Sequence, residues 1–294
     1  MRKIFGIVRA GAILTINFFV LCMILGVEWA LGGIMIIGGF AYFGGPLRLA
    51  RDRAIPLQNL DTYYQFKLEN AYQLLREQGE KAGVGLSQFH LFILPDDRIN
   101  AYSYDRKHIG VTKGLLALDE GSIAGVLAHE IGHCLSADSF FKRILFCDIT
   151  IVVFSLGVAG ALSAAFIWII FALLCLCGVC SGLLSFSIAN FLQKAVRSMF
   201  TGLQHIGLFI YQITVGLISR SMEYGADRFA VDMELGNELI FFLNRFSSLN
   251  SDSGPKPLSL RDVLYASHPS PAKRIKRLEK YCYTALPKEV NGHE

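Results

Sequence analysis

The residues with the clearest capacity for chemistry are His129, Glu130 and His133, which form the pattern HExxH. Residues four positions apart lie on one face of a helix, so two imidazoles at this spacing can bind one zinc ion. Glu130 lies beside that face, where its carboxylate can take a proton from the attacking water. Random order would produce the pattern in on the order of one chain in a hundred. Two ordinary helical histidines are therefore the weaker interpretation.

A third metal ligand is available in the segment 219–227, which has the sequence SRSMEYGAD. A catalytic zinc needs three protein ligands and an open fourth position. Glu223 and Asp227 share a helical face, so Glu223 can bind the metal while Asp227 accepts the outer N–H of a ligating histidine. Two acids at this spacing are usually solvated. Here the small and apolar neighbours Ala226 and Phe229 favour a buried metal site.

Four segments, taken in order, resemble those of the HtpX family of membrane zinc metalloproteases. They are Asn100-Ala101-Tyr102, the HExxH of 129–133, the SRxxExxAD element of 219–227 and Ser267-His268-Pro269. The similarity covers essentially the whole chain, including a membrane hairpin at the N-terminus and membrane helices between the two zinc motifs. HExxH alone is not specific, but the four segments together are.

The resemblance implies a role for each of seven residues. His129, His133 and Glu223 would bind one zinc ion per chain, Glu130 would be the general base, Asp227 would support a ligating histidine, and His268 and Asn100 would lie in the cleft. The last two would help to hold the substrate carbonyl or its developing oxyanion. His268 could equally be a surface histidine before a helix, and Asn100 a turn asparagine.

The function implied by the resemblance is a quality-control endopeptidase of the cytoplasmic (inner) membrane, which cleaves misfolded or selected membrane proteins from the cytoplasmic side. A strand near Asn100 would pair with the extended backbone of polypeptide substrates. One alternative is a processing protease for a lipidated or otherwise modified substrate. Another is a membrane scaffold whose zinc is structural. Glu130 argues against the scaffold, because a structural site normally closes its fourth coordination position.

The composition indicates a membrane protein. Of the 294 residues, 53% are apolar and 18% are charged, and the mean hydropathy is +0.43. The net charge of +4 is not concentrated in a long basic face, which argues against a nucleic-acid partner. Between residues 10 and 45 only Glu28 is charged at neutral pH, and 149–192 contains no charge. Since a span needs about 20 apolar residues, each region predicts a hairpin, giving about four spans.

Basic residues flank both uncharged regions. Those around the first are Arg2, Lys3, Arg9, Arg48, Arg51 and Arg53, and those around the second are Lys142, Arg143, Lys194 and Arg197. By the positive-inside rule these flanks are cytoplasmic, so both hairpins insert into the lipid bilayer and turn at its outer side. Trp29 and Trp168 lie near the midpoints, where an amphipathic ring at the outer interface would mark each turn.

The apolar stretch 199–219 follows the second region and contains two glutamines and a histidine. His133 and Glu223 must meet at one ion, so the chain between them crosses the membrane an even number of times. If 149–192 crosses twice, 199–219 is an interfacial or partly buried helix that leads into the ligand helix. If 199–219 does span, the preceding run crosses once or three times.

The predicted architecture is an α-helical membrane protein with an α+β, zincin-like metalloprotease domain. Its parts are an N-terminal transmembrane hairpin (1–45), a first protease segment with HExxH (46–143), a second transmembrane hairpin (144–192) and a second protease segment with ExxxD (193–294). The two protease segments together are long enough to build one core, which we expect on the cytoplasmic side.

Periodicity predicts the main elements of the protease segments. Residues 59–80 have an apolar stripe at helical spacing. The segments 90–94, 99–104 and 108–113 are rich in aromatic and β-branched residues, which predicts a small antiparallel sheet. A helix follows from Asp119, its expected cap, to about residue 138 and carries the HExxH motif.

Overall fold

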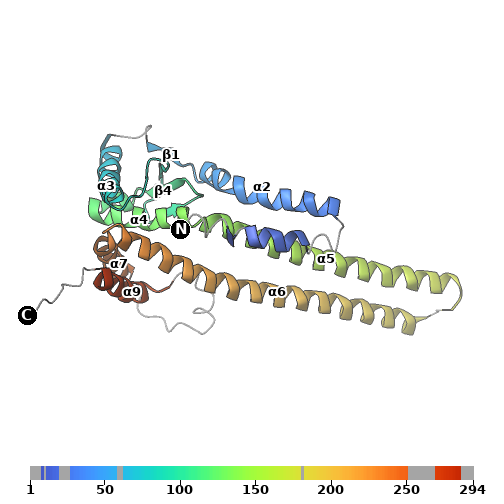
Figure 1. The fold of residues 1–294 in the computed structure, drawn as a ribbon. Helices are drawn as coiled ribbons and strands as arrows, with labels where there is room; N and C mark the ends of the chain where they lie inside the picture. The colour runs from blue at the N-terminus through green and yellow to red at the C-terminus, as the bar shows by residue number, and fades with distance from the viewer. Residues whose placement is uncertain are drawn as a thin grey trace, which may run out of the picture. The chain divides into compact units, whose positions relative to one another are not determined.

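The computed structural model shows a mostly helical chain with one small sheet (Figure 1). It describes residues 8–9, 11–19, 27–57, 62–179, 182–250 and 269–285. The chain divides into two compact units. The first is Met1–Ile144 with Gly216–Glu294, and the second is Leu145–Val215. The first unit therefore contains both zinc motifs, although the second unit separates them in the sequence.

The sheet of the first unit has four strands in the order β1-β2-β4-β3. They are β1 (Ile55–Pro56), β2 (His90–Leu94), β3 (Ala101–Ser103) and β4 (His108–Thr112). β4 pairs in parallel with β2 and antiparallel with β3, so the sheet is mixed, and the prediction of a purely antiparallel sheet is wrong. β4 takes a central place because Ile109 and Val111 are completely buried, whereas β3 is mostly half-buried and lies at the edge.

Helix α3 (Thr62–Lys81) packs against helix α4 (Glu120–Leu135). Its predicted apolar stripe is present, since Leu68, Ala71 and Leu75 are completely buried and belong to the core that the sheet and α4 share. Burial of each leucine contributes about 1.5–3 kcal/mol. This layer fixes α4 in the centre of the first unit.

Helix α4 carries the HExxH motif and has its predicted cap, Asp119. The Asp119 carboxylate accepts hydrogen bonds from the backbone N–H and the hydroxyl of Ser122, each at 2.8 Å. Such a cap stabilises a helix by about 1 kcal/mol. From 122 to 135 every residue except Glu130 is buried. From Ser122 onward the helix is thus a fixed support that is open to solvent only at the predicted base.

The second unit consists of parts of two long helices, α5 (Asp138–Leu176) and α6 (Leu183–Asp232). α5 continues through Trp168, so the turn predicted there is wrong. The chain reverses beyond the end of α5 instead. On that turn Gly178 and Gly182 have φ angles of +72° and +99°, which residues with a side chain rarely adopt.

Contacts within the second unit show that α6 runs antiparallel to α5. Gln204 donates a hydrogen bond of 2.8 Å to the carbonyl oxygen of Val153, and the rings of Trp168 and Phe186 lie 5.5 Å apart. Residues 199–219 are part of α6 rather than a separate helix. This arrangement fits the alternative in which the run before them crosses a membrane once.

Lys194 and Arg197 do not mark the end of a helix. They lie on α6 between Gln204 and Phe186, the residues whose contacts with α5 are given above. Their use as a cytoplasmic flank of a hairpin in 149–192 is therefore wrong. A basic residue indicates a flank only where the span ends, and here the helix continues past both residues.

Three helices in the described part of the chain are long and apolar enough to cross a membrane, namely Ala30–Arg51 within α2 (Val27–Arg51), α5 and α6. Residues 11–19 are also helical, where the first span of the N-terminal hairpin is predicted. Trp29 lies in the first turn of α2, and residues 20–26 are outside the described part. The predicted class, a helical membrane protein with a small α+β domain, is confirmed.

Candidate metal centre

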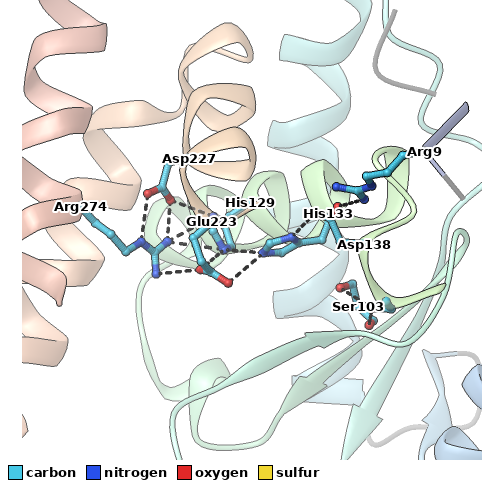
Figure 2. Close-up of polar contacts among 9 residues, drawn as sticks. Arg9, Ser103, His129, His133, Asp138, Glu223, Asp227 and Arg274 are labelled. Carbon is cyan, nitrogen blue, oxygen red and sulfur yellow. Dashed lines mark hydrogen bonds and ion pairs between the residues drawn. The ribbon is translucent and has the colours of Figure 1, made fainter. Parts of the chain in front are cut away.

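Three predicted ligands come together from two helices (Figure 2). His129 and His133 lie one turn apart on α4, and Glu223 lies on α6. The Nε2 atoms of the two histidines are 3.2 Å apart, and each is 3.4 Å from a carboxylate oxygen of Glu223. The three side chains are at most 8% exposed. The fold thus brings the whole predicted ligand set to one buried point.

The spacing of these ligand atoms fits zinc. Bonds of about 2.0–2.1 Å at tetrahedral angles place neighbouring ligand atoms about 3.3–3.4 Å apart. The two Nε2 atoms are 3.2 Å apart, and each lies 3.4 Å from a different oxygen of the Glu223 carboxylate, Oε2 for His129 and Oε1 for His133, so each of these distances is close to that value. Two imidazoles and one carboxylate leave a fourth position for water or substrate, which is typical of a catalytic zinc site.

Close packing of α4 on α6 sets these distances. A Cβ atom at Gly132 would lie only 2.9 Å from the Cα of Ala226. Gly132 is inside the HExxH motif, and Ala226 lies between Glu223 and Asp227 on the next helix. Two small residues therefore let the ligand-bearing faces meet, and a larger residue at 132 would force them apart.

Each histidine of the site contacts a buried aspartate through its outer nitrogen. Nδ1 of His129 donates to Oδ1 of Asp227 at 2.9 Å, and Nδ1 of His133 donates to Oδ2 of Asp138 at 2.8 Å. These contacts fix the tautomer in which Nε2 carries the lone pair that a metal needs. Asp227 was predicted in this place. Asp138 was not, because it follows His133 by five positions and lies outside the helical spacing of the motif.

Acidic side chains around His129 and His133 favour the protonated, positively charged form of both imidazoles. Burial opposes protonation of His133, but its hydrogen bonds with Asp138 and Glu223 outweigh burial and raise its pKa to about 10. Burial also opposes protonation of His129, and the bonds with Asp227 and Glu223 still raise its pKa. The carboxylates that stabilise a proton here also attract a metal cation, which must displace that proton when it binds.

Arg274, on helix α9 (Pro271–Ala285), is a further residue of the site. Its guanidinium donates two hydrogen bonds to the carboxylate of Asp227, at 3.0 and 2.6 Å, and its Nη1 lies 3.6 Å from Oε2 of Glu223. Such a two-point contact fixes the plane of the carboxylate. The resemblance of residues 267–269 to the HtpX family pointed to this part of the chain. Nothing in the sequence, however, distinguished Arg274 from the other basic residues of α9.

The remaining predicted residues are Glu130, Asn100 and His268. Glu130 follows His129 on α4 and is half-buried, so solvent reaches it. Asn100 lies just before β3, where its Nδ2 donates to the Tyr102 hydroxyl and its Oδ1 accepts from the backbone N–H of Ala101, both at 2.9 Å. The side-chain amide of Asn100 thus forms hydrogen bonds with residues of the neighbouring strand β3 rather than with the three metal ligands. His268 lies outside the described residues.

Comparison with known proteins identifies the family. The sequence model of Peptidase family M48 matches residues 68–282, which is more than half of the chain and includes both zinc motifs. The chain belongs to peptidase family M48. M48 peptidases are in general zinc-dependent, so the HExxH and ExxxD motifs of this chain are those of a metalloprotease.

Relatives of this M48 peptidase include Protease HtpX of Shewanella pealeana, which is 24% identical over 96% of this chain and 100% of the relative. A Protease HtpX homolog of Bacillus licheniformis is 24% identical over 76% of this chain and 71% of its own length. The crystal structure of S. mikatae Ste24p matches with a TM-score of 0.48 and 21% identity, covering 91% of this chain and 62% of that chain. The M48 match and the HtpX relatives confirm the predicted resemblance, and the chain is a membrane metalloprotease.

Proposed function

We propose that this M48 peptidase is a zinc-dependent endopeptidase of the cytoplasmic (inner) membrane that cleaves misfolded or selected membrane proteins. The observation that carries the proposal is the meeting of His129, His133 and Glu223 at zinc-ligand spacing, beside the solvent-accessible Glu130. A structural zinc site would have no use for this accessible acid.

In the proposed reaction the side chains of the centre have separate roles. His129, His133 and Glu223 would hold zinc, which when bound would act as a Lewis acid toward the water and the substrate carbonyl. Glu130 takes a proton from the attacking water as the water oxygen bonds to the carbonyl carbon. It then gives this proton to the amine nitrogen as the C–N bond breaks. We assign the support of the carbonyl oxygen to His268, and to Asn100 once its amide leaves Tyr102.

The edge strand β3 supports a polypeptide as the substrate. β3 ends one side of the sheet and packs against α4, the helix that carries Glu130. An extended segment of substrate can pair with such an edge through main-chain hydrogen bonds, which depend little on side chains. This mode suits an enzyme that must accept many unfolded sequences.

The placement of charge supports a cytoplasmic active site. α2 carries Arg48 and Arg51 in its last turn, and Arg143 lies near the start of α5, before the uncharged run 149–192. All three residues belong to the unit that contains the metal centre. By the positive-inside rule they lie on the cytoplasmic side, and the turn between α5 and α6 lies on the outer side.

A reporter experiment tests this orientation. Alkaline phosphatase, which is active only outside the cytoplasm, is fused after Gly178 in the turn and, separately, after Asn250 at the end of α7 (Gly236–Asn250). We expect activity from the first fusion and none from the second. The opposite pattern would invert the proposed topology.

Proteolysis by the purified full-length chain in detergent tests the function itself. We expect cleavage of casein, an unfolded substrate, to stop when phenanthroline removes the metal and to return when zinc is added. Zinc content is measured alongside activity. Casein cleavage that continues in protein stripped of zinc would contradict the proposed chemistry.

A further inference from the structure

Both histidines of the centre are supported by the same kind of arrangement, in which a buried aspartate connects the histidine to an arginine from a distant part of the chain (Figure 2). The two sets are His129 with Asp227 and Arg274, and His133 with Asp138 and Arg9. Arg9 precedes the first uncharged region, and no motif connects it with the metal site. Its contact with the centre arises only in the folded chain.

We propose that Arg9 is a positioning residue for metal binding, because it holds Asp138 and thereby keeps His133 in the orientation that binds zinc. The inference rests on the zinc site proposed above. Nη2 of Arg9 donates to Oδ1 of Asp138 at 2.7 Å, and Oδ2 of the same carboxylate accepts from Nδ1 of His133 at 2.8 Å. One carboxylate therefore joins Arg9 to the ligand.

The burial of Asp138 explains why this contact matters. The residue is only 3% exposed, and a buried carboxylate is costly unless its oxygens are paired and hydrogen-bonded. His133 satisfies one oxygen, and Arg9 satisfies the other. Without Arg9 the carboxylate loses one of the two contacts that fix its plane. The ring of His133 then loses a rigid partner, and partners of this kind tune metal affinity.

The backbone between α4 and α5 supplies a second, independent reason. Ala137 is buried and has a φ angle of +55°, a left-handed conformation that is unfavourable for a residue with a Cβ atom. This kink directs Asp138 back toward the ligand. Arg9 also donates to the carbonyl oxygen of Ser136 at 3.2 Å, and its guanidinium lies 4.1 Å from the ring centre of Phe141. Arg9 therefore contacts the chain on both sides of the kink and stabilises it.

Zinc affinity of the full-length protein in detergent tests the proposal. Arg9→Gln removes the charge, and we expect zinc binding to weaken about 10- to 100-fold and zinc to pass faster to a competing chelator. Arg9→Lys retains a charge that can pair with Asp138 and should recover part of the affinity. Arg51→Gln is the matched control. It removes a 75% exposed arginine that flanks the same uncharged region, and it should bind zinc as the parent does.

A double-mutant cycle shows whether the effect passes through Asp138. In an Asp138→Asn background the link is already broken, so Arg9→Gln should weaken zinc binding little further. Equal losses in both backgrounds, or parental affinity of Arg9→Gln, would overturn the proposal. Thermal unfolding of the zinc-free variants confirms that they are folded. Should Arg9→Gln not fold, Arg9→Lys enters the same cycle, and its affinity loss must disappear in the Asp138→Asn background. A parent chain that binds no zinc contradicts the proposed function instead.

Discussion

Replacing Glu130 with glutamine is expected to lower kcat/KM for casein by about a thousandfold while the zinc content stays at the parental value. Glutamine has nearly the same shape but cannot accept the proton of the attacking water. Glu130 is not one of the three side chains that meet at zinc-ligand spacing, so the metal should remain. Because the residue is half-buried and glutamine keeps the shape of the side chain, the exchange should not disturb the packing of α4.

The matched control is Glu120→Gln, at the start of the same helix. Glu120 is exposed and accepts a hydrogen bond from Asn70, which glutamine can replace. This variant should cleave casein at the parental rate. Both variants are compared in steady-state cleavage, with zinc measured in the same samples. Parental turnover in Glu130→Gln would refute the assignment of the general base.

Replacing Glu223 with alanine is expected to reduce bound zinc from about one ion per chain to less than about a tenth of that, and to abolish cleavage. Two histidines alone are too few ligands for a catalytic zinc. The loss also leaves Arg274, whose Nη1 lies 3.6 Å from Glu223, without one of the acids that balance its charge. The zinc that remains should leave rapidly when a chelator is added.

Asp232→Ala serves as the control for this change. Asp232 is an exposed acid at the end of the same helix and should not affect zinc binding. Metal content is measured after gel filtration, and circular dichroism verifies that the helical content of the chain is unchanged. A Glu223→Ala protein that keeps the parental zinc content would remove Glu223 from the ligand set.

The ligand set could be predicted from the sequence because helical spacing is local information. His129 and His133 lie one turn apart whatever the rest of the chain does, and the same holds for Glu223 and Asp227. The structure brings the two pairs together where small residues allow close approach. To predict that Glu223 joins the two histidines at one ion, and that Asp227 supports one of them, it was enough to assume that both helices belong to one site.

The outer supports of the site could not be predicted in this way. Asp138 reaches His133 only because the backbone kinks at Ala137, and no helical periodicity indicates that kink. Arg9 and Arg274 approach from opposite ends of the sequence through tertiary packing. Each is one of many basic residues, and a charge carries no information about its partner before the chain folds.

The position of the turn between the two long helices could not be predicted from the sequence, for a different reason. The uncharged run 149–192 is long enough for two spans, but it is also compatible with one long helix and the start of another. Hydropathy is the same in both cases, so it cannot locate the turn. The backbone does so at Gly178 and Gly182, whose left-handed conformations are accessible to glycine. The sheet shows the same limit. β4 lies between β2 and β3 because its side chains are buried, and the alternation of apolar and polar residues along a strand does not predict this position.

The division of the metal ligands between α4 and α6 has a consequence for biosynthesis. The ribosome makes the two histidines first, then most of the long helical pair, then Glu223, and Arg274 after it. The nascent chain therefore lacks a complete set of ligands until most of the helical pair has been made. Its proteolytic capacity therefore cannot arise before Glu223 has been translated, so a nascent copy that lacks this residue does not cleave neighbouring proteins.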